Sequence, residues 1–222
     1  DERSMRHCGP TGRGAGGEQP GVGMIDERWV YLTLVLNLVG SAHYIAMILK
    51  GQVRPNRASW LLWAVAPAVV LAAELDQGVG LRTLMTFGIA LGPLLVLLAS
   101  YLRRGAYWQL GLFDWACGGL SGLAVLLWAL TDAPNSAIIL SIAADALAAV
   151  PTIRKSISHP ETEHPLFFVF VSAGGALTLL TLQRWTFADW AFPVYIFVFP
   201  GFLALLIWRQ QRRASGRAAL AH

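Results

Sequence analysis

The sequence has little charge, almost no lysine and few cysteines. Only 14% of its 222 residues are charged, whereas a soluble domain carries about 25%. Two cysteines, Cys8 and Cys117, cannot build a disulfide framework, and there is no CxxC pair. The HExxH, GxSxG and Walker A motifs are also absent, as is any Cys/His cluster with metal-ligand spacing. The sequence therefore argues against a soluble enzyme, and we expect no catalytic residue, no cofactor and no metal.

The chain has long apolar segments instead, and 55% of its residues are hydrophobic. A helix needs about 20 mostly apolar residues to cross the hydrocarbon core of a bilayer. Seven segments meet or approach this length, and the loops between them are charged or rich in Gly, Pro and Asn. They are Trp29–Leu49, Trp60–Leu75, Leu81–Leu102, Leu112–Leu130, Ser136–Ile153, Leu166–Leu182 and Trp190–Trp208. The sequence predicts an all-α integral membrane protein with seven transmembrane helices.

Basic residues gather in alternate loops and after the last span, which predicts the orientation. They are Lys50, Arg54, Arg57, Arg103, Arg104, Arg154, Lys155, Arg209, Arg212, Arg213 and Arg217. Because basic loops remain on the cytoplasmic side, we expect the N-terminus outside and the C-terminus in the cytoplasm, in a plasma membrane such as the bacterial inner membrane. Residues 1–23 are rich in Gly and charge, and we set them apart from the fold as a flexible tail, native or not.

A shift of 105 residues reveals an internal repeat. It places Lys50 on Lys155, Pro55 on Pro160 and Trp63 on Phe168, and it aligns spans one to three with spans five to seven. Three crossings reverse the direction of the chain, so a second parallel unit needs one extra crossing, which the fourth span supplies. The predicted units are a first three-helix repeat (24–102), a linker helix (103–132), a second three-helix repeat (133–210) and a basic C-terminal tail (211–222).

This layout resembles the PQ-loop superfamily, which includes the SWEET (MtN3) sugar transporters. The segments HYIAMILKGQVRPNRASWLLW and AAVPTIRKSISHPETEHPLFF also resemble that family, in which the first helix of each repeat ends at a Pro-Gln pair. Pro151 takes the proline position in the second repeat and Thr152 replaces the glutamine, whereas Ala46 and Met47 stand there in the first. Transporters of vitamin precursors of the PnuC type share a similar layout. The resemblance implies solute transport, with Pro151 as a hinge.

Two ionisable residues, His43 and Asp145, lie away from the ends of predicted spans, where such groups are costly and often functional. Asp145 lies roughly 12 Å from the cytoplasmic end of the fifth span at the helical rise, among small residues. The 105-residue shift relates it to Gly40, close to His43 in the first span. Together the two groups could form a proton relay or a polar substrate clamp. The alternative is hydrogen bonding that only holds the helices together.

Other residues of the spans are candidates for a substrate pathway. Asn37, Ser41 and Tyr44 share one helix face, which either lines the pathway or joins helices. Trp63 and Phe168, equivalent under the repeat, either stack on a ring-shaped solute or pack in the bundle. Glu74, near the outer end of the second span, is expected in solvent. Tryptophans at span ends are expected at the membrane interface; they are Trp29, Trp60, Trp108, Trp185, Trp190 and Trp208.

These patterns favour a membrane transporter for a small polar solute, similar to a sugar or a vitamin precursor. Alternating access would come from the rocking of the two three-helix units. The alternative is a membrane scaffold or accessory subunit that does not transport, and a membrane enzyme or receptor is a third class. The expected partners are the lipid bilayer and the solute, and a homo-oligomer is compatible with both. Nucleic acid is not expected as a partner.

Overall fold

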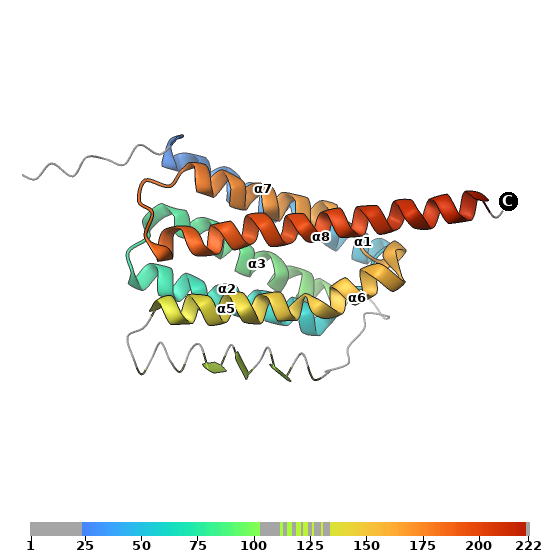
Figure 1. Ribbon diagram of the computed structural model, residues 1–222, viewed down its shortest axis with the longest axis horizontal. Helices are drawn as coiled ribbons and strands as arrows, with labels where there is room; N and C mark the ends of the chain where they lie inside the picture. Colours follow the sequence, from blue (N-terminus) through green and yellow to red (C-terminus); the bar gives the residue numbers. More distant parts are fainter. Residues whose placement is uncertain are drawn as a thin grey trace, which may run out of the picture.

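The computed structural model describes residues 24–102 and 134–220, together with nine isolated positions between them (Figure 1). The predicted tail (1–23) lies outside the described residues. So does the linker helix (103–132) with its span Leu112–Leu130, apart from those isolated positions. The helices are η1 (Glu27–Trp29), α1 (Val30–Lys50), α2 (Arg57–Asp76), η2 (Gly80–Arg82), α3 (Thr83–Ser100), α5 (Pro134–Ala148), α6 (Val150–Ser158), η3 (Pro160–Thr162), α7 (Leu166–Leu180) and α8 (Phe187–Leu220). The prediction of an all-α chain is confirmed for the described residues.

Five of the helical segments are long and apolar enough to cross a membrane, which is consistent with an integral membrane protein. They are Glu27–Lys50, Arg57–Asp76, Gly80–Ser100, Pro134–Ser158 and Phe187–Ser215. Helix α7 is apolar as well, but it is shorter, with 15 residues. The predicted spans outside the linker coincide with these helices, although the ends of the segments differ by several residues.

Local sequence explains where the first two helices end and begin. Gly51 ends α1 in the left-handed conformation, with φ of 75°, and its N–H donates to the carbonyl of Ile48. Glycine adopts this conformation without steric cost, which is why it so often follows a helix. Asn56 then caps α2, because its side-chain oxygen accepts a hydrogen bond of 3.0 Å from the N–H of Ala58.

A break at Ala149 separates α5 from α6, and the chain bends there (Figure 1). Pro151 has no N–H, so it cannot donate to the carbonyl of Leu147 one turn earlier. The helix ends at that point and restarts at Val150, with Pro151 in its first turn. The sequence prediction placed a hinge at Pro151, and the break lies two residues before it.

Helix α8 is longer than the predicted span Trp190–Trp208. It has 34 residues and continues to Leu220, so that it extends beyond the rest of the bundle (Figure 1). The segment 209–215 is rich in Arg, Gln and Ala, which favour helix. Residues 211–220, predicted as part of a basic tail, therefore prolong the last helix.

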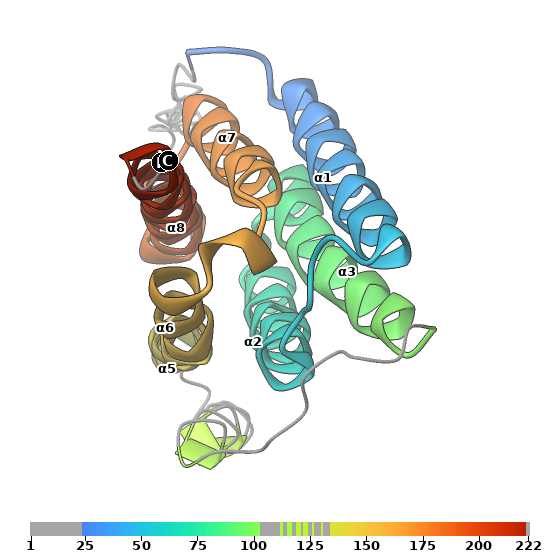
Figure 2. The same cartoon turned by 90° about the vertical axis from the view of Figure 1, so that its right-hand side faces the viewer.

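The helices form two groups that face each other (Figure 2). In the first group, α3 packs against both α1 and α2. In the second group, α8 packs against α7 and, less extensively, against α5. Between the groups, α1 contacts α7 and α2 contacts α5. The interface therefore pairs the first helix of each group with the second helix of the other.

An aromatic cluster lies at the interface between the groups. Trp60 stands 4.8 Å from Tyr44 and 5.0 Å from Phe167, measured between ring centroids, and the Trp60 ring is buried. Trp60 was expected at the membrane interface. It lies in the first turn of α2, near the end of a candidate span, and its ring packs on α1 and α7.

Candidate functional site

A small cavity lies between the two groups of helices. Its walls come from α1, α2 and α3 of the first group and from α5, α7 and α8 of the second. Its volume is about 40 Å³, room for about three water molecules. The space accessible to a ligand in this structure is therefore small.

Asp145 is the only acidic or basic residue among the described residues that line the cavity. Its side chain is buried, with 7% exposed, and the Tyr195 hydroxyl donates to Oδ2 over 2.6 Å. The indole Nε1 of Trp63 donates to the backbone carbonyl of Asp145 over 3.2 Å, which fixes α2 against α5 at this level. The lining thus holds one carboxyl group and no lysine, arginine or histidine.

The amide group of Asn37 in α1 lines the same cavity as Asp145 and has no hydrogen-bond partner within the described structure. The residue is 1% exposed, and neither Oδ1 nor Nδ2 makes a hydrogen bond within the described structure. Gly88 of α3 and Gly174 of α7 make room for it, since a Cβ at either position would lie 3.4 Å from Nδ2. A buried amide without partners is costly, so Asn37 is a group that a ligand would satisfy.

The other polar residue of the α1 stripe is Ser41. Its hydroxyl donates to the carbonyl of Asn37 over 2.8 Å. A Cβ at Gly92 of α3 would overlap this hydroxyl oxygen, so a larger residue there would force the Ser41 side chain to move. The stripe therefore both lines the cavity and packs α1 against α3.

Aromatic rings form much of the remaining wall. Trp63 and Phe168 meet edge to face, with centroids 5.9 Å apart and an interplanar angle of 81°. Phe199 stacks on Tyr195 at 5.3 Å and 19°. The aromatic pair predicted from the repeat is thus in contact across the interface and contributes to the cavity wall.

Two prolines of the wall interrupt the hydrogen bonding of the third helix in each group. Pro93 lies in α3 and Pro200 in α8, and each removes the N–H that would bond the carbonyl four residues earlier. Those carbonyls belong to Ile89 and Ile196, which also line the cavity. Membrane helices tolerate such breaks where neighbouring groups or a cavity can take up the freed carbonyl.

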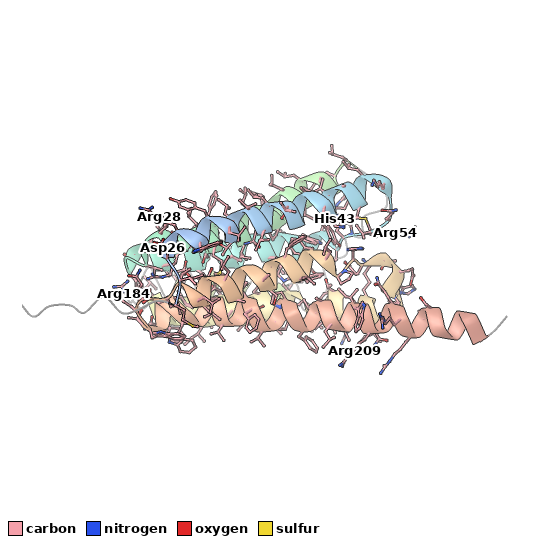
Figure 3. All side chains as sticks on the ribbon, turned by 90° about the horizontal axis from the view of Figure 1, so that it is seen from above. Asp26, Arg28, His43, Arg54, Arg184 and Arg209 are labelled. Carbon is pink, nitrogen blue, oxygen red and sulfur yellow. The ribbon has the colours of Figure 1, made fainter. Side chains whose placement is uncertain are left out.

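Five of the six residues predicted for a substrate pathway line this cavity: Asn37, Ser41, Trp63, Asp145 and Phe168. The sixth, His43, is not among the lining residues. Its ring lies 5.0 Å from that of His164, near the end of the bundle where Arg54 lies (Figure 3). Burial, and secondarily the neighbouring His43, lower the pKa of His164. The N–H of Leu166 donates to Nδ1 of His164 over 3.3 Å, in keeping with a neutral ring.

Sequence reasoning missed Tyr195 and Phe199. Both lie in the run FPVYIFVFP, which is apolar throughout. Phe199 lines the cavity and Tyr195 bonds Asp145, but no pattern distinguishes them from Phe197 and Phe202, which are exposed. The only signal is the pair of prolines in the run, which marks a perturbed stretch of helix.

At one end of the bundle, the Glu163 end, polar contacts join the two groups. Tyr44 of α1 donates to Oε2 of Glu163 over 2.7 Å, and Nζ of Lys155 lies 2.8 Å from Oε1. Lys155 also donates to the carbonyl of Arg54, and Gln211 of α8 donates to the backbone carbonyl of Glu163. Glu163 is 3% exposed. These contacts close the cavity from this end.

At the opposite end, the Arg82 end, an ion-pair cluster joins the groups. Arg82 lies 2.9 Å from Asp189 of α8 and 3.6 Å from Glu27, while Arg184 lies 3.7 Å from Asp189. The Arg82 side chain is 6% exposed and that of Asp189 is fully buried. Figure 3 shows Arg28 and Arg184 at this end, away from His43 and Arg54.

Glu74, near the same end, is only 2% exposed. The expectation that it is solvated is wrong, because its side chain is buried close enough to Arg82 and Asp189 to interact with their charges.

In comparisons with models of protein families, with curated proteins and with solved structures, none matches this chain.

Proposed function

We propose that the protein is an integral membrane transporter that moves a small polar solute by alternating access. In this proposal the chain crosses the membrane seven times, as two parallel three-helix repeats joined by a linker helix at 103–132. The alternative from the sequence, a scaffold that does not transport, has no need of a polar cavity.

The reciprocal packing of the helices supports the repeat. The third helix of each group contacts the first and second helices of the same group. Across the interface, α1 contacts α7 and α2 contacts α5. A twofold axis between equivalent units requires this pattern, because it places the first helix of each unit against the second helix of the other. Parallel repeats about an axis along the membrane normal are a transporter architecture, with the substrate site at the repeat interface.

The cavity itself is the observation that carries the proposal. It brings a carboxyl group and an unpartnered amide together between the two groups, near the middle of α1 and of the α5–α6 segment. Polar groups at such depth cost free energy in a bilayer. A protein that only packed against partners would gain nothing from that cost, whereas a transporter uses the groups to bind its solute.

Alternating access also requires a closure at each end that can open in turn. The Tyr44–Glu163–Lys155 contacts supply one at the Glu163 end, and the Arg82–Asp189 pair supplies the other. Both link the first group to the second, so each must break when the groups rock apart at its end. In this proposal, the structure with both sets of contacts intact is a state in which neither closure has opened.

Uptake into proteoliposomes tests the proposal. The purified protein is reconstituted into liposomes, and exchange of a panel of labelled sugars, nucleosides, small acids and amines is measured. Liposomes without protein are the control. We expect exchange of at least one class, and a loss of exchange in Asp145→Asn at equal protein content. If the folded protein exchanges none of the panel faster than empty liposomes, the scaffold alternative is favoured.

A further inference from the structure

Among the described residues, the lining of the central cavity holds one carboxyl group, an unpartnered amide and no cationic side chain. Asp145 supplies the only ionisable group among the described lining residues, and its one polar contact is the Tyr195 hydroxyl, which brings no charge. A buried carboxyl group is stabilised either by a proton or by a cation. Since the lining offers no cationic side chain, the partner must come from outside the protein.

The neutral polar groups of the wall favour the same kind of ligand. Within the described structure neither Oδ1 nor Nδ2 of Asn37 has a hydrogen-bond partner, and Oδ1 is the atom that an N–H donor of a ligand would satisfy. Pro93 and Pro200 deprive the carbonyls of Ile89 and Ile196 of their N–H partners within the helix. A ligand that carries several N–H donors on a positive charge would satisfy these acceptors and the carboxylate together.

The aromatic wall favours an organic cation over a hydrated inorganic one. Trp63, Phe168 and Phe199 line the same cavity as Asp145. The faces of such rings attract cations that have lost their water, and their surfaces bury the carbon atoms attached to the charged nitrogen. A strongly hydrated metal ion gains little from this wall.

The volume of the cavity points to a small ligand. A space of about 40 Å³ accommodates about three water-sized groups, close to the size of a short amine. A hexose is several times larger and would need the two groups to move apart before it could bind.

We propose that the central cavity binds a small primary amine in its ammonium form, held by the Asp145 carboxylate and by Oδ1 of Asn37. This inference rests on the proposed transporter function, because it names the solute class of the same site. It replaces the sugar that the family resemblance implies.

A set of small ligands that differ in charge and in N–H donors tests these two properties separately. Binding to the full-length protein in nanodiscs is measured by calorimetry for ethanolamine, choline, ethylene glycol, 3-hydroxypropionate, glucose and potassium chloride. We expect ethanolamine to bind most tightly, and choline, which has the charge but no N–H, about tenfold more weakly, because one charge-assisted hydrogen bond is worth about that factor. The neutral and anionic ligands should not bind. This comparison uses the wild-type protein, so it does not depend on the folding of any variant.

Variants then locate the site. Asp145→Asn keeps the size of the side chain but removes its charge, and should weaken ethanolamine binding by about tenfold to a hundredfold. Asn37→Leu should weaken it by a smaller factor. Asp76→Asn removes an exposed carboxylate at the end of α2 and should leave binding unchanged. Unchanged ethanolamine binding in Asp145→Asn would overturn the inference, as would ethylene glycol, glucose or potassium binding as tightly as ethanolamine.

Counterflow of labelled ethanolamine in proteoliposomes separates this inference from the transporter proposal. If glucose exchanges and ethanolamine neither binds nor exchanges, the inference fails while transport stands. If ethanolamine binds with the expected dependence on Asp145 but no solute exchanges, the site is upheld and the transporter proposal fails. If Asp145→Asn changes only the pH dependence of glucose exchange, Asp145 carries a proton and the amine site is refuted.

Discussion

Replacing Asp189 by asparagine removes the buried partner of Arg82 at the Arg82 end of the bundle. The two charges lie 2.9 Å apart, so their attraction is about 6 kcal/mol at an effective dielectric constant of about 20. Desolvation cancels part of this attraction, and breaking one side of a buried pair costs about 3–5 kcal/mol net. We expect that loss in the free energy of unfolding of Asp189→Asn. Within the described structure, the ion pair that Arg82 then keeps is the longer one to Glu27, at 3.6 Å.

The reverse change should cost less. In Arg82→Gln the carboxylate of Asp189 retains the Thr186 hydroxyl at 2.5 Å and Arg184 at 3.7 Å. It also lies in the first turn of α8, where the helix dipole favours an anion. These contacts should make Arg82→Gln less destabilising than Asp189→Asn by about 1–2 kcal/mol.

Unfolding in mixed micelles, titrated with sodium dodecyl sulfate and followed by tryptophan fluorescence, measures both variants and the double variant. The double variant should cost less than the sum of the single ones, because the second change no longer breaks an intact pair. Asp76→Asn, an exposed carboxylate near the same end, is the control and should stay within about 0.5 kcal/mol of the wild type. Additive costs, or equal costs for the two single variants, would refute the reasoning.

Three further predictions concern pH, packing and orientation. Burial and a neighbouring imidazole lower the pKa of His164, so the folded state favours its neutral form. The free energy of unfolding should therefore be largest above its ordinary pKa of about 6.5 and fall as the pH drops below that value. The same pH dependence in His164→Phe would contradict this prediction. A Cβ at Gly175 would lie 2.6 Å from the backbone nitrogen of Phe197, so Gly175→Ala should force α7 and α8 apart and lower the free energy of unfolding by about 1–3 kcal/mol, whereas a stability equal to that of the wild type would show that the helices yield without cost. In a cysteine-free background, a cysteine at the exposed Gln183 should react with an impermeant maleimide added to intact cells and one at the exposed Gln52 should not; the opposite result would reverse the proposed orientation.

The positions of the helices could be predicted because apolar segments of about the length of a membrane span are easily recognised in a sequence. Asn37 and Asp145 could be recognised as candidates for the same reason, since each is a polar residue within such a run. His43 met the same criterion, yet it does not line the cavity. It lies six positions after Asn37, which turns it to a different face of α1 at 3.6 residues per turn.

The closures at the two ends could not be predicted from the sequence. Arg82, Asp189 and Glu163 lie at helix ends or in loops, where charged residues are normally solvated. Their burial arises from contacts between distant segments: Arg82 of η2 meets Asp189 of α8 at one end, and Tyr44 of α1 meets Glu163 at the other. The partners are separated by 107 and 119 residues. No local pattern encodes such pairs. The 105-residue shift, which compares residues by position and not by contact, does not reveal them either.

The shortness of α7 has a consequence for the lipid around the protein. Its 15 residues span about 22 Å at the helical rise, less than the hydrocarbon thickness of about 30 Å. Val169 and Leu180 are exposed on its surface. In the proposed membrane-spanning arrangement, lipids beside α7 would compress to match its length, at a cost of fractions of a kcal/mol per Å of mismatch. Lipids with shorter acyl chains should therefore relieve the mismatch at α7.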